Sequence, residues 1–599
     1  MYLSPRKKLF FAMPALVLVL AVFLLFRFQR DEHLFVSFCQ ELFATEMQGD
    51  TLAMHYHIRH PEDFQIYSYE PTLPVYQAGS ELSVPVRLEN TLAQMEKIDP
   101  EHLSGQNAIL YQLLKQSLTL QLSLSRYSYY SDPLSPSGGM QTELPLLLTE
   151  YRFDTLRDVE DYLALLEQLD SYLSGLLLYE QEKAAAGKFM AESSAQKLIE
   201  QCHTMIDVDQ LRQGTHFLQV TFKERTEKLY QEQVLSNEQK SHYDEENDRL
   251  LKTVVQPAYE TLADGLEVLG NQCQKLAGLS AYPQGCDYYA LYFRSQTGSP
   301  ISPAQWKEVL ADEIGRSYQE LSALFTAHPE IRDMLNSDSI FFPLTDAETI
   351  LEQLAFRMQE DFPLLPVPVT YRVKTVSDCL SPYVAPAYYL TPAIDATTDN
   401  VIYLNPRSHP DSLELYTVLA HEGFPGHLYQ SVYSTEYLAS QNVLPLRHLL
   451  GCSGYAEGWA LYVEFLSYDY GAQLLRDQGK ELDSYCCEAL KLNRRLQLAL
   501  LSLLDISVHN DGADEKQVST ILKNFGLSNG SRVYAYLVEE PANYCKYFIG
   551  YLEILSLQQE AKALWGKDYS AMRFHQFLLE CGSSDFEWIH QNLKAAALN

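Results

Sequence analysis

Apolar residues recur at helical spacing along most of this chain, and this periodicity limits the possible folds more than any other feature. Residues 158–183 carry leucines and tyrosines at i, i+3, i+4 and i+7, which is typical of an amphipathic helix. Residues 223–252 are rich in charge, and we expect one long solvent-exposed helix there. The 599 residues, 46% hydrophobic and 12% aromatic, can bury a large core. We therefore expect a large, mainly helical globular protein.

One stretch, residues 366–405, has the pattern of a β-sheet instead. Residues 367–376 alternate between apolar and polar side chains, as a half-buried strand does. Residues 387–390 and 401–404 are short β-type runs separated by turn residues. The fold class that follows is mainly α (α+β), with one small sheet among many helices.

The amino terminus carries an uncharged apolar run, residues 9–26, that is long enough to cross a bilayer. Its eighteen residues would span about 27 Å as a helix, close to the thickness of the hydrocarbon core. The basic residues 6–8 precede it, which favours a cytoplasmic amino terminus. No small-residue cleavage site follows, so we expect an uncleaved signal-anchor rather than a removed signal peptide. The sequence thus predicts a cytoplasmic stub and transmembrane helix in residues 1–30 of a single-pass cell-membrane protein, with the rest extracytoplasmic.

Residues 31–599 show no repeat, no low-complexity linker and no second apolar span. Turn-rich segments at 131–139 and 298–303 are the candidate breaks. We expect one domain over residues 31–599, which can be divided into a helical subdomain over residues 31–300 and a second subdomain over residues 301–599. The formal net charge of −33 repels phosphate backbones, so we expect no nucleic-acid partner.

The residues most informative about chemistry are His421, Glu422 and His427, which follow an apolar helical pattern. Imidazoles bind zinc, and an adjacent carboxylate can accept a proton from an attacking water. The familiar helical form places the histidines at i and i+4, whereas here they stand at i and i+6. On a regular helix those side chains would point about 240° apart. We therefore predict that Pro425 and Gly426 bend the chain and bring His427 back beside His421.

A carboxylate from a second helix would complete the set of ligands. Glu457 lies in an apolar helical pattern thirty residues past His427, and it would give three protein ligands with a position open for water. Glu464, seven residues further, shares its face and is a candidate for orienting a ligand. The alternative is that both histidines are ordinary helix-end residues. We favour the first interpretation, which predicts one Zn²⁺ ion.

Further candidate residues lie downstream and upstream of these motifs. Asp505 and His509 stand at i and i+4, so that Asp505 could support the site and His509 could stabilise a developing negative charge. Tyr551 could donate to the same charge. The run 401–404 could hold an extended peptide along a sheet edge. The residues that we expect to contact a substrate are Tyr389, Tyr403, Asn405 and Tyr544.

These motifs make the chain similar to the DUF885 family, bacterial proteins grouped with the gluzincin-type metallopeptidases. The resemblance rests mainly on HEGFPGH at residues 421–427 and EGWALY at residues 457–462. It implies a mainly helical, metallopeptidase-like fold in which a small sheet edges a deep groove. It also implies that the zinc ligands are His421, His427 and Glu457.

Together with the predicted membrane anchor, the resemblance implies a membrane-anchored zinc peptidase that cleaves small or extended peptides, with Glu422 as general base and residues 301–599 as the catalytic half. One departure is visible: the family usually has two histidines after the glycine, and Leu428 replaces the second. If the missing histidine were the true ligand, the chain would be a weakened enzyme. The alternative is therefore a peptide- or cell-wall-fragment-binding protein of the same fold. A purely structural envelope protein ranks last, because it leaves the motifs unexplained.

Overall fold

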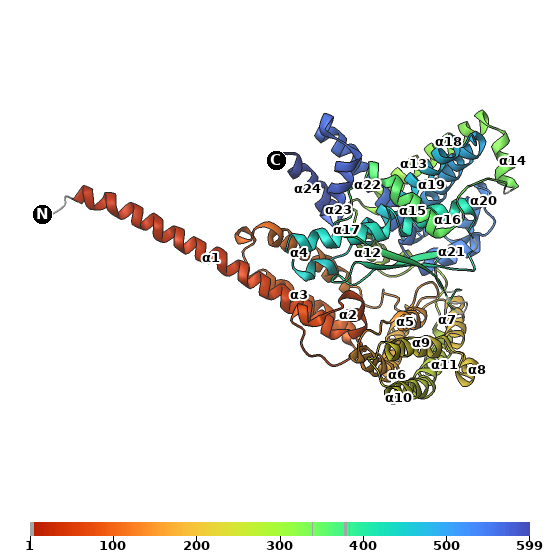
Figure 1. Ribbon diagram of the computed structural model, residues 1–599, viewed down its shortest axis with the longest axis horizontal. Helices are drawn as coiled ribbons and strands as arrows, with labels where there is room; N and C mark the ends of the chain where they lie inside the picture. Colours follow the sequence, from red (N-terminus) through yellow and green to blue (C-terminus); the bar gives the residue numbers. More distant parts are fainter. Residues whose placement is uncertain (1–4, 338, 377–379, 382–383, 409, 599) are drawn as a thin grey trace.

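Helices make up most of the molecule, and one small sheet lies between their two main groups (Figure 1). The computed structural model describes the backbone of residues 5–598, apart from residues 338, 377–379, 382–383 and 409. Side chains are described from residue 27 to residue 597 with the same gaps. The predicted mainly helical fold with a small sheet is confirmed.

The sheet has three strands, all within the predicted stretch. They are β1 (Thr370–Thr375), β2 (Ala387–Leu390) and β3 (Asp399–Leu404). The central strand is β3, which pairs in parallel with β1 and antiparallel with β2. Its side chains alternate between two hydrophobic cores, with Val401 and Tyr403 facing the N-terminal half and Ile402 and Leu404 facing the C-terminal half. The expectation that residues 401–404 form a sheet edge is therefore wrong, and β2 is an edge strand instead.

Helices of the N-terminal half form two hydrophobic cores, one of which packs under the sheet. The predicted helix over residues 158–183 is confirmed, and Thr155 starts it through a capping box with Asp158. The predicted single helix over residues 223–252 is wrong, because the chain turns after residue 231 and Ser236 caps a new helix. The helices of this half are α1 (Pro5–Gly49), α2 (Thr51–His57), α3 (Val84–Met95), α4 (Gly105–Ser125), α5 (Met140–Glu150), α6 (Leu156–Ala185), α7 (Glu192–Met205), α8 (Val208–Gln213), α9 (Phe217–Gln231), α10 (Asn237–Leu250) and α11 (Gln256–Leu269).

The C-terminal half is built around two helices, α18 (Ser453–Asp477) and α22 (Asn543–Trp565), which pack against each other. Their backbones meet at glycines: a Cβ on Gly458 would lie 2.4 Å from the carbonyl carbon of Gly550. Only glycine permits this approach. The other helices of this half are α12 (Gly285–Thr297), α13 (Pro303–Ala327), α14 (Glu330–Asn336), α15 (Ala347–Arg357), α16 (Ser412–Glu422), α17 (His427–Ser440), α19 (Glu481–His509), α20 (Glu515–Asn524), α21 (Gly530–Glu539), α23 (Ala571–Cys581) and α24 (Phe586–Leu598).

Helix α1 includes the predicted membrane-spanning run, residues 9–26, whose side chains lie outside the described ones. In the part of the chain searched, no helix is long and apolar enough to span a bilayer. The later part of α1 packs onto the N-terminal half, where Phe35 and Phe43 join a core with residues of α4. It also contacts the short helix η9 (Pro445–Leu449). The transmembrane anchor and the division near residue 300 stay predictions.

Candidate metal centre

The chain bends between the two histidines, as the sequence predicts. His421 lies in the last turn of α16 and His427 opens α17, so the two imidazoles come from different helices. The linker between them contains a cis peptide bond before Pro425. Gly426 packs against the end of α16: a Cβ there would lie 1.8 Å from the carbonyl oxygen of His421. The glycine is therefore required for the close approach that returns His427 to His421.

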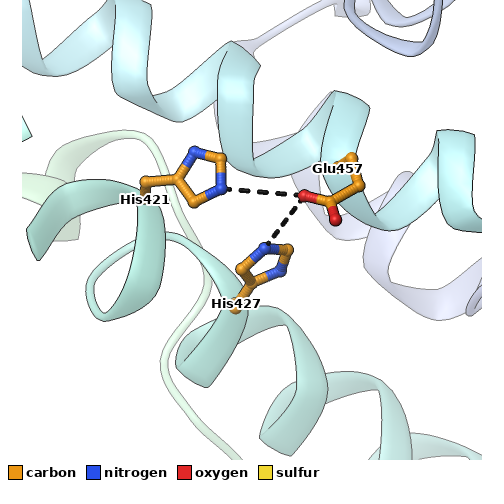
Figure 2. Close-up of side chains that lie close together, drawn as sticks. All are labelled: His421, His427 and Glu457. Atoms are coloured by element: carbon orange, nitrogen blue, oxygen red, sulfur yellow. Dashed lines mark ion pairs between the residues drawn. The ribbon is translucent and has the colours of Figure 1, made fainter. Parts of the chain in front are cut away.

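Helix α18 fixes this linker and supplies a third side chain. Trp459 is fully buried, and its indole Nε1 donates to the carbonyl oxygen of Pro425 at 2.9 Å. Two residues earlier, Glu457 faces both histidines (Figure 2). Its Oε2 lies 3.7 Å from His421 Nε2 and 3.4 Å from His427 Nε2. One motif on α18 thus both holds the bend and completes the cluster.

The three side chains have the spacing of ligands around one metal ion. Two ligands at 2.0–2.1 Å from a tetrahedral zinc lie about 3.4 Å apart, close to the observed distances. All three candidate ligand atoms lie within 4.8 Å of one another. Glu457 Oε2 is buried yet accepts no hydrogen bond, which is unusual for a buried carboxylate. Among the described residues, no other group of three or more histidines, cysteines or carboxylates converges in this way.

Glu464 orients the imidazole of His421 through Nδ1, the ring nitrogen that does not face Glu457. Its Oε2 lies 3.0 Å from His421 Nδ1, and its Oε1 lies 3.3 Å from Arg494 Nε. Donation of the Nδ1 proton to Glu464 would leave Nε2 as the nitrogen available to a metal, on the side of Glu457. Burial alone would lower the pKa of His421, but the carboxylates of Glu457 and Glu464 outweigh it and raise that pKa to about 10. The two carboxylates therefore favour positive charge at His421.

Glu422, next to His421, lies beside the cluster. Its Oε2 accepts a hydrogen bond from the main-chain N–H of Tyr389 in β2 at 2.8 Å. Burial raises the pKa of Glu422, although the imidazoles of His421 and His427 oppose the shift. A carboxylate with a raised pKa is suited to accept a proton and then return it. Strand β2 thus aligns a candidate base through its backbone.

A cavity of about 590 Å³ opens beside His427. The cavity is lined by one face of α17, by β2 with the segment after it, by α2, by η9 with the residues after it, and by the start of α18. Polar side chains of α17, Gln430, Ser431 and Ser434, and apolar groups such as Leu390 of β2 both line the cavity. Such a cavity suits a short peptide or another small molecule.

Asp505 and His509 belong to a separate buried network, so the structure does not give them the site roles that we predicted. Both ring nitrogens of His509 are used by the main chain: Nδ1 accepts from Leu279 at 3.1 Å and Nε2 donates to Leu537 at 2.8 Å. Asp505 accepts from the main-chain N–H of Ala542 at 3.0 Å. Burial lowers the pKa of His509 to about 4 and raises that of Asp505 to about 7. The pair ties α19 to neighbouring segments.

Tyr547, rather than the predicted Tyr551, faces the cluster. Its ring centroid lies 6.2 Å from that of His421, and burial together with the nearby Glu457 carboxylate raises the pKa of its phenol. Tyr551 lies one turn further along α22 and packs against Phe465, with ring centroids 4.9 Å apart. The two tyrosines share one motif and one helix, so only the placement of α22 against α18 distinguishes them.

Of the four predicted substrate contacts, Tyr389 lines the cavity. Tyr403 points to the opposite side of the sheet, where its hydroxyl bonds Glu150. The side chain of Asn405 bonds main-chain groups of neighbouring turns, 2.8 Å from one carbonyl oxygen and 3.0 Å from one N–H. Tyr544 packs against a tyrosine of α21. The last three therefore serve the fold in this structure, and strand alternation explains the placement of Tyr403.

Leu428, which stands where the resemblance implies a second histidine, is fully buried in the hydrophobic core of the C-terminal half. The histidine that is kept, His427, is the one that reaches Glu457. The substitution therefore falls outside the candidate ligand set.

Comparison with known proteins identifies the family. The sequence model of a family described as "Bacterial protein of unknown function (DUF885)" matches residues 66–592. Two solved structures share the fold. One, from Colwellia psychrerythraea, is described as a "putative lipoprotein" and has a TM-score of 0.78 at 20% identity, over 95% of this chain and 99% of that chain. The other, a "putative lipoprotein of unknown function" from Shewanella oneidensis, has a TM-score of 0.61 at 17% identity, over 94% and 99%.

No curated protein matches the sequence. The match to the family model covers far more than half of the chain, from a residue shortly after α2 to a residue within α24. The protein therefore belongs to the DUF885 family of bacterial proteins.

Proposed function

We propose that the protein is a zinc-dependent peptidase that hydrolyses peptide bonds in small or extended peptides. The observation that carries the proposal is the convergence of His421 Nε2, His427 Nε2 and Glu457 Oε2, with Glu422 beside them. A histidine–histidine–glutamate set is one that catalytic zinc sites use, with one coordination position left open. A zinc ion there would polarise the scissile carbonyl group and make an attacking water more acidic.

The chain's own residues supply the remaining steps. Glu422 accepts the proton of the attacking water at its carboxylate and passes it to the leaving amine, which a raised pKa favours. The phenol of Tyr547 donates to the negative charge that develops on the carbonyl oxygen. Glu464 keeps His421 in the tautomer and orientation of a ligand.

The outer edge of β2 supports binding of an extended substrate. In an antiparallel pair, alternate residues direct their main-chain groups away from the partner strand. The N–H of Tyr389 points to Glu422, so its carbonyl group and the main-chain groups of Ala387 face the same side. A peptide lying beside β2 would pair with them and pass the candidate metal ligands.

We further propose that residues 9–26 anchor the protein in the cell membrane and that the peptidase acts outside the cytoplasm. The apolar run and the basic residues before it support this placement. The two similar structures, each described as a "putative lipoprotein", are consistent with it. The net charge of −33 argues against a nucleic-acid partner.

The test is the Glu422→Gln variant of the detergent-solubilised full chain. We expect one zinc ion per chain in both the parent and the variant, because Glu422 is not a ligand. Cleavage of a defined peptide mixture should fall by about 10²–10⁴-fold, the usual contribution of a general base. Glu352→Gln, on the exposed side of α15, should change neither quantity. Cleavage by Glu422→Gln at the rate of the parent protein, or a parent protein that binds no zinc, would refute the proposal.

A further inference from the structure

A buried cation, Arg447, lines the same cavity as His427. It lies in η9, and only 4% of its surface is exposed. Among the described residues, no carboxylate lies within 4.0 Å of its guanidinium, and the strongest influence on its pKa is burial, which lowers it. A buried charge normally has a partner of opposite sign. Since acidic residues outnumber basic ones by 78 to 45, an unpaired buried arginine calls for an explanation.

The hydrogen bonds of Arg447 go to neutral acceptors and leave capacity for a ligand. Nη2 donates to the carbonyl oxygen of Cys581 at 2.9 Å and to Ser584 Oγ at 2.7 Å, while Nη1 donates to the carbonyl oxygen of Leu450 at 3.3 Å. A guanidinium has five N–H donors, so two of them have no acceptor among the described residues. These bonds fix the orientation of the side chain without neutralising its charge.

Helix α17 connects Arg447 to the candidate metal centre. The α17 residues that line the cavity recur on one face, from His427 to Leu438, and the helix rises about 16 Å between them. Arg447 lies at the Leu438 end, since a Cβ on Gly582 would be 3.1 Å from Leu438 Cδ1 and 3.3 Å from Arg447 Nη2. An extended peptide advances about 3.3 Å per residue, so up to about five residues cover this distance.

We propose that Arg447 binds the carboxyl-terminal carboxylate of peptide substrates, so that cleavage releases a short fragment from the carboxyl end. Arginine binds carboxylates through charge-assisted, geometrically defined hydrogen bonds. The cavity volume suits a short peptide segment. A carboxylate bound at the end of the cavity remote from His427 would therefore be the carboxyl terminus of the substrate peptide. This proposal rests on the proposed peptidase function and specifies its substrate class.

The test compares peptides that differ only at the carboxyl end. A pool of randomised octapeptides with free carboxylates and the same pool with carboxamide ends are incubated with the zinc-loaded full chain, and the products are identified by mass spectrometry. We expect cuts at one short distance from the carboxyl end, and at least tenfold slower cleavage of the amide pool. Scattered cuts, or equal rates for the two pools, would overturn the role of Arg447 and leave the peptidase proposal intact.

A binding measurement separates this proposal from catalysis. Zinc-loaded Glu422→Gln protein is titrated calorimetrically with tetrapeptide versions of both pools. The pool with free carboxylates (the acid pool) should bind at least tenfold more tightly than the pool with carboxamide ends (the amide pool). Arg447→Gln should remove the difference, whereas Arg372→Gln, at an exposed ion pair of β1, should keep it. The acid–amide comparison on the unmodified Arg447 holds even if Arg447→Gln fails to fold.

Each remaining outcome decides between the two proposals. Equal binding of both pools, or binding of neither, would overturn the role of Arg447. Selection of Asp or Glu at one position of the amide pool would also overturn it, in favour of side-chain recognition. Preferential binding of the acid pool without any cleavage by the parent would keep the Arg447 site and refute the peptidase function.

Discussion

Replacing Gly426 with alanine tests the bend on which the candidate site depends. The added Cβ would lie 1.8 Å from the carbonyl oxygen of His421 and 2.3 Å from that of Ala420. To reach the 3.0 Å that real contacts keep, the first pair of atoms must separate by about 1.2 Å. The displacement would act directly on His427, the next residue in the chain.

This displacement is large compared with what a zinc site tolerates. Ligand distances are held to within about 0.2 Å, so His427 would leave the ligand set. We expect zinc affinity to fall at least about 100-fold, which corresponds to about 2.7 kcal/mol. Overpacking of a tight site should also lower the free energy of unfolding by about 1–3 kcal/mol.

The assay is a zinc titration against a competing chelator, with chemical denaturation as the measure of stability. Gly315→Ala is the matched control, because a Cβ at this position of α13 would meet nothing within 4 Å. That control should keep its zinc affinity and gain up to about 1 kcal/mol of stability, since alanine favours helix. Parental zinc affinity in a folded Gly426→Ala protein would refute the reasoning.

Three further predictions concern side chains near and away from the cluster. Glu464→Gln should lower zinc affinity about 10–100-fold in a chelator competition, because His421 loses the carboxylate that orients it; unchanged affinity would contradict this. Tyr547→Phe should lower kcat about 10²–10³-fold with zinc retained, whereas Tyr551→Phe should leave kcat unchanged; the reverse pattern in peptide-hydrolysis kinetics would exclude Tyr547. Burial lowers the pKa of His509 to about 4 in the folded protein, so the unfolded chain binds a proton at this residue more readily. As the pH falls from about 6.5 to about 4, protonation of His509 in the unfolded chain should therefore lower the free energy of unfolding by about 3 kcal/mol. His509→Gln should make the decline of Tm over that range shallower, and an equally steep decline would contradict it.

The fold class could be predicted because periodicity depends on the chain alone. The helix over residues 158–183 and the three β-type runs appear where their patterns place them. The break between α9 and α10 was missed, since charge-rich residues continue through it and only Ser236 with Gln239 marks a new start. The order of strands was also missed: nothing in residues 401–404 shows that β1 and β2 cover both of their edges.

The candidate metal centre could be predicted from spacing combined with backbone chemistry. An i, i+6 pair of histidines cannot share a metal on one regular helix, so the chain had to leave the helix between them. It does: α16 ends at Glu422, α17 begins at His427, and Pro425 and Gly426 lie in the linker. The position of Glu457 followed from its helix.

Residues whose role depends on how helices pack could not be assigned in this way. Tyr547 and Tyr551 differ only in their position along α22. The spacing of His509 from Asp505 suggests a site residue, but in the structure main-chain groups of Leu279 and Leu537 bond both of its ring nitrogens. Arg447 could not be identified from the sequence, because only the structure shows that its guanidinium has no carboxylate partner among the described residues.

The most direct test of the account is a crystal structure of the zinc-soaked protein with data collected on both sides of the zinc absorption edge. We expect one anomalous peak per chain, about 2.0–2.2 Å from His421 Nε2, His427 Nε2 and a carboxylate oxygen of Glu457. A peak bound by other residues, or no peak between these three side chains at saturating zinc, would contradict the central claim.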